Sequence, residues 1–313
     1  MPTATTRSAK EPELIGLSRE ATTVLDAVLA DATVKVRERI SSKGRVDSTS
    51  FDREQRATHG LAWLATYVEA IRQLAAYAER MSRAGKLGET EDLLVRIGLG
   101  EYLAQVFGGI PMSQGEVVRL TDLGVTSAQV AARMTPVVEG LMVSGNSAER
   151  RARLIALMRT HHGATIGACG LDDTLESIRD EMRKFADSEV IENAQKWHLA
   201  NSYIPLDVIA QMSALGVFGL TIPEDFGGMG LGKESMCVVS EELSRGYIGI
   251  GSLGTRSEIA AELILGSGTD AQRKKWLPKI ASGEVLPTAV FTEPNTGSDL
   301  ASIKTRAVRE GNV

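Results

Sequence analysis

Cysteine is scarce in this sequence, and its scarcity excludes two kinds of site. The two cysteines, Cys169 and Cys237, are far apart, and neither belongs to a C-x-x-C pair. The chain therefore has neither the cysteine pattern of a small disulfide-stabilised domain nor that of a zinc site. This composition fits best a protein of the reducing cytoplasm.

Long apolar runs and an excess of positive charge are also lacking. Residues 1–13 are polar and have no apolar stretch of the kind found in a signal peptide, and no later apolar run is long enough to span a bilayer. The formal net charge is −5, with Lys and Arg interspersed among Asp and Glu. We therefore expect neither a membrane nor a nucleic acid as a partner.

Histidine is limited to four residues, and their spacing does not favour a catalytic or metal site. His161 and His162 are adjacent, but no carboxylate or third histidine lies at the spacing of metal ligands, so a surface position is the better interpretation. His59 and His198 are isolated, and no Ser, His and Asp follow the order of a hydrolase triad. We expect no bound metal.

What the sequence does contain is apolar periodicity, with 43% hydrophobic and 24% charged residues in 313 positions. This is enough for a substantial core and for two or three domains. Ser18 is a candidate N-cap of a first helix, and apolar residues at helical spacing continue from Phe51 to Met81. Residues 1–168 are therefore expected to form a helical bundle, with further helices over 89–106, 126–142 and 147–161.

A Gly-rich stretch over 162–170 marks the expected boundary to a second helical region. Directly after it, Asp173 and Glu176 have the pattern of a capping box at the start of a helix. Pro205 in the first turn and Gly216 just past the end bracket a further helix in the expected order.

Two or three more helices are expected over 232–280, and the character of the sequence then changes. The segment LPTAVFTEP, which begins at Leu286, is β-prone, and SIKTRAVR alternates with a period of two. Both segments predict strands. The final GNV has the chemistry of a hairpin turn, so we expect the native chain to continue beyond Val313 with the rest of the sheet.

The segment GIGSLG, residues 249–254, formally matches the G-x-G-x-x-G pattern of a dinucleotide-binding turn. The residues before it, EELSRGYI, have a helical pattern rather than that of a strand, so the required context is missing. Close packing between helices is the better explanation of these small residues.

Two other segments combine residue types that suit ligand binding. Residues 222–231, IPEDFGGMGL, form a Gly-dense loop, and residues 291–299, FTEPNTGSD, combine hydroxyls, a rigid proline and a glycine that allows close backbone approach. Each is also explained as a simple turn. Between them lies GTDAQRKKWLPKIASGE, residues 268–284. In this order the three segments resemble the acyl-CoA dehydrogenase family, whose members carry PEEYGGxG, GTEEQKxKYLPxLASGE and TEPxAGSD.

The resemblance covers about residues 172–313 and implies a mainly α fold. Residues 1–168 are then a helical N-terminal extension, 169–286 the family's N-terminal helical domain, and 287–313 the truncated start of its middle β-domain. FAD is the implied cofactor, an acyl-CoA the substrate and an electron-transfer flavoprotein the electron acceptor, in an enzyme that is a homo-oligomer when full length. In this family a carboxylate removes the α-proton while the β-hydride passes to the flavin.

The resemblance also implies roles for individual residues. Phe291 and Thr292 lie along the flavin ring, where the Thr292 hydroxyl bonds a flavin oxygen. Gly297 and Ser298 approach the pyrophosphate and the CoA ester. No catalytic residue is assigned within this chain, because the family's catalytic glutamate belongs to the C-terminal domain and is expected beyond Val313.

The extension narrows the expected substrate. Its segments LAWLATYVEAIRQLAAYAERM and EYLAQVFGGIPMSQGE are similar to the extension of one branch of the family, which implies oxidation of (2S)-methylsuccinyl-CoA to mesaconyl-CoA. The free carboxylate of that substrate needs a cation, for which Arg256 is the candidate. The alternative is that Arg256 pairs with Glu258 or Glu262 on the helix surface. Residues 105–109 also resemble a Q-x-x-G-G element of the family's C-terminal helical domain, so we interpret the extension as a degenerate helical copy that alters oligomer assembly.

A function of a different class also stays open. The chain is alternatively a non-catalytic helical binding or assembly protein that retains an acyl-CoA dehydrogenase-like half as a scaffold.

Overall fold

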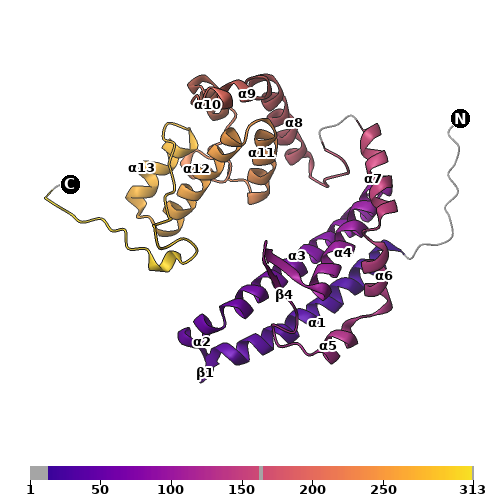
Figure 1. Cartoon of the computed structure of the whole chain (residues 1–313). Coiled ribbons are helices and arrows are strands. Elements are labelled where there is room, and N and C mark those ends of the chain that lie inside the picture. Colours follow the sequence, from indigo (N-terminus) through magenta and orange to yellow (C-terminus); the bar gives the residue numbers. More distant parts are fainter. Residues whose placement is uncertain (1–12, 162–164, 312–313) are drawn as a thin grey trace, which may run out of the picture. The chain divides into compact units, whose positions relative to one another are not determined.

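The computed structural model describes residues 13–161 and 165–311, which fold into two compact units (Figure 1). The division falls between Gly170 and Leu171. Both units are predominantly helical, which confirms the expected mainly α class. None of the helices within the described ranges has the length and apolar character needed to cross a membrane.

The first unit combines helices with two short antiparallel hairpins, β1–β2 and β3–β4. Ser41 pairs with Val46 in the first hairpin, and Ile110 pairs with Val118 in the second. The elements are α1 (Leu14–Ile40), β1 (Ser41–Ser42), β2 (Arg45–Val46), α2 (Ser48–Arg53), α3 (Gln55–Arg83), α4 (Glu89–Gly108), β3 (Ile110–Ser113), β4 (Glu116–Val118), α5 (Ser127–Arg133), α6 (Pro136–Ser144) and α7 (Ala148–Thr160).

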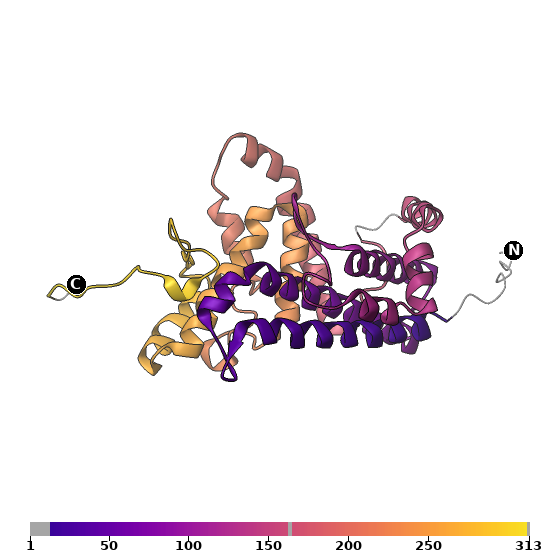
Figure 2. The same cartoon turned by 60° about the horizontal axis from the view of Figure 1, so that its bottom comes forward.

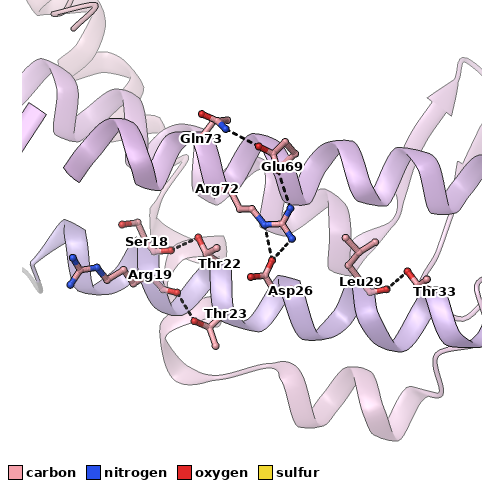
Figure 3. A network of polar contacts seen from close by, with 10 residues as sticks. All are labelled: Ser18, Arg19, Thr22, Thr23, Asp26, Leu29, Thr33, Glu69, Arg72 and Gln73. Atoms are coloured by element: carbon pink, nitrogen blue, oxygen red, sulfur yellow. Dashed lines mark hydrogen bonds and ion pairs between the residues drawn. The ribbon is translucent and has the colours of Figure 1, made fainter. Parts of the chain in front are cut away.

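Helices α1 and α3 lie side by side and antiparallel (Figure 1, Figure 2). Arg19 pairs with Glu79 and Asp26 pairs with Arg72, so the order of contacts is reversed between the two helices. Arg72 donates to Asp26 through Nε at 2.9 Å and Nη2 at 2.7 Å, as Figure 3 shows. These ion pairs are half-exposed and contribute little to the free energy of unfolding. Burial of apolar side chains therefore holds the two helices together. The fully buried residues of this seam include Leu25, Val28, Leu64, Val68 and Ile71.

Helix α4 crosses the turn between α6 and α7 at backbone contact distance. A Cβ atom built on Gly100 would lie 2.7 Å from the amide nitrogen of Asn146, 2.8 Å from the carbonyl oxygen of Leu141 and 2.9 Å from the Cα of Gly145. No side chain fits there without a shift of backbone. Gly100 is therefore required by packing.

Three local expectations for this unit need correction. Ser18 does not cap α1, because the helix begins four residues earlier at Leu14 and Ser18 is buried within it, donating to the Ile15 carbonyl at 3.0 Å. The helix expected over 126–142 is two helices, since Thr135 caps α6 and Pro136 occupies its first turn. The two hairpins were not expected at all.

The second unit packs its helices around Met212, Phe218 and Leu243. The Gly-rich segment before this unit is described only from residue 165, and residues 162–164 lie outside the described part. The elements are α8 (Asp173–Phe185), the π-helical turn η1 (Ala186–Ile191), α9 (Glu192–Leu199), α10 (Leu206–Ala214), the 3₁₀ turn η2 (Glu224–Phe226), α11 (Lys233–Gly246), α12 (Ile248–Ser267), α13 (Asp270–Ala281) and the 3₁₀ turn η3 (Leu300–Ser302).

Helix boundaries in this unit follow the sequence signals closely. The cap of α8 is Asp172 rather than Asp173, and its side chain accepts from the Leu175 amide at 2.8 Å. Pro205 is the N-cap of α10, and Gly216 lies just past the end of that helix with a φ of +75°. Two or three helices were expected over 232–280, and the structure has three, α11, α12 and α13.

The two strands expected after Leu286 are not formed. Within residues 286–311, the structure has one isolated bridge between Glu293 and Thr296 and the short turn η3. A strand is stabilised by hydrogen bonds to a neighbouring strand, and none of the described residues supplies one here. The start of a β-domain over 287–313 therefore stays a prediction.

A buried carboxylate joins three elements of the second unit. The side chain of Glu242, on α11, is 2% exposed and accepts from Arg183 of α8 at 2.5 Å and from Arg245 at 3.1 Å. Arg245 also donates to Asp187 of η1 at 2.6 Å. Burial by itself would raise the pKa of Glu242, but the hydrogen bonds and charges of the two arginines outweigh it and hold the pKa below its usual value.

We predict that Gly100→Ala destabilises the first unit by about 1–3 kcal/mol, because the added methyl group collides with backbone on all sides. The matched control is Gly140→Ala, at an exposed position of α6 where an added Cβ meets nothing within 4 Å. This change is expected to be neutral or stabilising by up to about 1 kcal/mol. Hydrogen exchange of the α4 and α6 amides reads out this unit alone, and equal protection in both variants would contradict the packing argument.

We predict that Glu242→Gln destabilises the second unit by about 3 kcal/mol at neutral pH, the lower end for a broken buried pair, because both arginines keep some solvent contact. Since the folded-state pKa of Glu242 is lowered, its contribution is present above the ordinary glutamate pKa and is lost as the pH falls through the folded value. The variant should therefore lack this acid-dependent loss. Glu241→Gln, exposed on the same helix, is the control. Hydrogen exchange of α11 that is equally fast in both variants would refute the role of Glu242.

Candidate functional site

The segment from Phe291 to Thr305 folds back on itself around one carboxylate. The backbones of Glu293 and Thr296 exchange hydrogen bonds of 2.8 and 3.1 Å, which makes a tight turn. The Glu293 carboxylate then accepts from the amides of Lys304 and Thr305, at 3.1 and 2.6 Å, and from the Thr305 hydroxyl at 2.5 Å. One side chain thus closes the loop that carries the residues expected at the flavin.

Glu293 is the residue that the sequence interpretation missed. Hydrogen bonds from Thr305 and Lys304 lower the pKa of its carboxyl group, although Glu293 is only half-buried. No local pattern predicts a partner that lies eleven or twelve residues further along the chain. The available signal was its place beside Thr292 within the family motif of residues 291–299.

The loop brings together the residues expected to contact the cofactor. Thr292, Gly297 and Ser298 are exposed, and the Phe291 side chain is 38% exposed. A Cβ atom added to Gly297 would meet only the Thr292 Cγ2, at 3.8 Å, and the φ of Gly297 is not in the left-handed region. Nothing within the described chain therefore requires a glycine here. The hydroxyls of Thr292 and Ser298 have no hydrogen-bond partner among the described residues and remain free to bind a ligand.

The Gly-dense loop over 222–231 has a structural explanation. Gly228 lies against the Ile222 backbone, where an added Cβ would be 2.0 Å from the carbonyl oxygen. The loop backbone is tied down by bonds from Met229 to Gly219 and from Leu231 to Leu220, at 2.9 and 2.8 Å. This geometry matches the simple interpretation of the segment as a turn cluster.

The segment over 249–254 lies inside α12 and forms no phosphate-binding turn. An added Cβ on Gly251 would lie 2.0 Å from the Ser244 hydroxyl oxygen and 2.8 Å from its amide nitrogen. On Gly254 it would lie 3.1 Å from Val217 Cγ1. The small residues therefore allow α12 to pack closely on its neighbours, as the sequence context indicated.

Arg256 is exposed on α12 and has no ion-pair or hydrogen-bond partner within the described ranges. The alternative pairing was wrong, because Glu258 and Glu262 both bind Lys233 of α11, at 2.8 and 2.6 Å. The physical reason is spacing. Side chains two and six positions from Arg256 do not share its helix face, which belongs to residues three or four positions away. No bond joins Arg256 to the loop that carries Thr292.

Gln105, the first residue of the Q-x-x-G-G element, is engaged within the first unit. Its Oε1 accepts from the Tyr67 hydroxyl at 2.5 Å, and its Nε2 donates to Glu101 at 2.6 Å. Glu101 accepts in turn from Asn146 at 2.6 Å. The amide therefore has a packing role that joins α3, α4 and the turn before α7.

The described histidines, cysteines and carboxylates form no cluster able to hold a metal ion. His161 lies exposed at the C-terminal end of α7, and its neighbour His162 falls outside the described residues. His59 instead contacts Trp63, whose indole nitrogen donates to it at 3.0 Å.

Known proteins are similar to this chain in both units. Residues 172–284 match the model of the acyl-CoA dehydrogenase N-terminal domain. The chain is 54% identical over 301 residues to (2S)-methylsuccinyl-CoA dehydrogenase of Cereibacter sphaeroides, a match that covers 96% of this chain and 54% of the relative. Mitochondrial isovaleryl-CoA dehydrogenase of Solanum tuberosum is 36% identical over 142 residues, or 44% of this chain and 34% of the relative. The chain thus spans about half the length of the first relative.

One solved structure, described as "Electron transferring flavoprotein of Acidaminococcus fermentans: Towards a mechanism of flavin-based electron bifurcation", matches 46% of this chain and 38% of its own. The identity is 30% and the TM-score 0.43, which is too low to establish a shared fold. The sequence matches carry the assignment. By its N-terminal domain over 172–284 and its identity along nearly the whole chain, the protein belongs to the acyl-CoA dehydrogenase family.

Proposed function

We propose that the protein is part of a flavin-dependent enzyme that oxidises an acyl-CoA thioester between its α and β carbons. The observation that carries this proposal is the loop around Glu293, which presents two unpaired hydroxyls and an unobstructed glycine within the family's own motif. FAD is the proposed cofactor. When bound, it supplies the acceptor for the hydride that leaves the β carbon.

The loop residues fit such a cofactor chemically. The hydroxyls of Thr292 and Ser298 would donate to polar flavin or phosphate oxygens, and Gly297 would let the backbone approach the same group. Phe291 offers an apolar surface beside them. The Glu293 bonds hold this arrangement before any ligand arrives, which reduces the entropy lost on binding.

We propose (2S)-methylsuccinyl-CoA as the substrate and mesaconyl-CoA as the product. The name of the relative that is 54% identical along nearly this whole chain supports this choice. Such a substrate carries a free carboxylate, which is costly to desolvate without a cation. Arg256 is available for that role, because it is exposed and has no partner among the described residues.

We propose that electrons leave through an electron-transfer flavoprotein, that the enzyme is a cytoplasmic homo-oligomer and that the first unit contributes to its assembly. The first unit has a core of its own, built on α1, α3 and α4, and therefore does not depend on the second unit to bury its apolar residues. We assign the role of the glutamate that removes the α-proton to none of the described residues.

We predict that Thr292→Val and Ser298→Ala weaken flavin binding in the complete gene product by about tenfold or more each. Each change removes one hydrogen bond to a charged or polar group, worth roughly 1.5–3 kcal/mol in the charged case. Flavin fluorescence titration of the apoprotein measures this. Ser202→Ala, at an exposed position outside the loop, is the control and should bind as the wild type does. Unchanged affinity and flavin reduction rate in both loop variants would exclude these two contacts.

We predict that Arg256→Gln lowers kcat/KM for methylsuccinyl-CoA by at least about tenfold, or roughly 1.4 kcal/mol, and leaves butyryl-CoA unaffected. The kcat/KM of Arg256→Lys for methylsuccinyl-CoA should fall between those of the wild type and Arg256→Gln, because an ammonium group keeps the charge but loses bidentate geometry. Arg37→Gln removes the same charge from the exposed surface of α1 and serves as the control. An equal loss for both substrates, or no loss for either, would show that Arg256 does not bind the substrate carboxylate.

A further inference from the structure

Two segments that carry the family resemblance, residues 222–231 and 268–284, have no chemical role in the proposed function. Both contribute residues to one pocket of the second unit. The pocket has a volume of about 240 Å³ and is lined by Phe226, Leu265, Asp270, Arg273 and Lys274. Phe226 belongs to the Gly-dense loop, and the three charged residues belong to the first turns of α13. None of these residues is among those proposed to bind the flavin or the substrate carboxylate.

One wall of the pocket is apolar and firmly supported. Phe226 and Leu265 are half-buried and pack on the cluster of Ile222, Ala261 and Leu277. The start of α13 is fixed by a capping box, since Thr269 and Gln272 bond each other's amides. The wall therefore exists without a ligand, and an apolar group placed against it would gain burial at little cost in ordering.

The rim of the pocket has an excess of positive charge. Arg273 contacts Asp270 through Nη1 at 3.2 Å, but its Nε is buried without a hydrogen-bond partner. Lys274 has no partner among the residues that the structure describes. Two cations thus stand against one carboxylate at this rim.

We propose that this pocket binds a small organic anion, a carboxylate or phosphate monoester attached to a compact apolar group. The apolar group would lie on Phe226 and Leu265, and the anion would accept from Lys274 and from the Arg273 guanidinium, which both line the pocket. A volume of about 240 Å³ is below the roughly 300–1,000 Å³ of pockets for drug-sized ligands, so the ligand is smaller than these.

The test titrates the complete gene product with four probes and follows binding by saturation-transfer NMR and calorimetry. Benzoate and phenyl phosphate carry both features of the proposed ligand and distinguish a carboxylate from a phosphate. Benzamide keeps the ring without the charge, and inorganic phosphate keeps the charge without the ring. We expect saturable binding of benzoate or phenyl phosphate that is at least about tenfold tighter than that of either control probe.

Variants then locate the binding on the protein. Arg273→Gln and Lys274→Gln should each weaken the better probe by about tenfold, whereas Lys196→Gln, which removes an exposed charge from α9, should leave it unchanged. The proposal would be overturned if binding were not saturable, or if Lys196→Gln had the same effect as the two pocket variants. It would also be overturned if benzamide bound as tightly as benzoate, or inorganic phosphate as tightly as phenyl phosphate. Because no flavin or turnover is measured, these outcomes are independent of the proposed enzymatic activity.

Discussion

The buried carboxylate of Glu242 is the interaction on which the second unit depends. By binding Arg183 and Arg245, it fixes α8 and η1 against α11. Helix α12 then packs on α11 through the contact of Gly251 with Ser244, and α13 packs on α12 around Leu277. The positions of Arg256 and of the apolar wall of the pocket therefore depend on α11. Loss of the Glu242 charge would disturb both Arg256 and that wall.

The sequence predicted the helices well because their ends are determined locally. Pro205 and Gly216 act within one turn of chain, and periodicity indicated the long helices. Burial and bonds between distant residues explain two of the failures. Ser18 looks like a cap but is buried in α1, and the Glu293 carboxylate finds partners at Lys304 and Thr305 that no short-range pattern shows.

The candidate site was predictable in the identity of its residues but not in their arrangement. The motif over 291–299 identified Thr292, Gly297 and Ser298 through family resemblance. Their exposure and their lack of partners are properties that only the structure shows. The strands expected around them are not formed in the described residues, since alternation predicts the faces of a strand but cannot supply the neighbour to which it bonds. Arg256 illustrates a related limit, because the sequence does not show that Glu258 and Glu262 bind Lys233 of another helix.

We propose an enzyme that transfers hydride from an acyl-CoA with a free carboxylate to a bound flavin. The most direct test is the visible absorbance of the complete gene product, mixed without oxygen with methylsuccinyl-CoA, butyryl-CoA or isobutyryl-CoA. We expect the purified protein to be yellow and methylsuccinyl-CoA to bleach it faster than the two uncharged acyl-CoA esters. A colourless protein that cannot be loaded with flavin, or a bound flavin that none of the three esters reduces, would contradict the proposed function and favour a non-catalytic assembly protein.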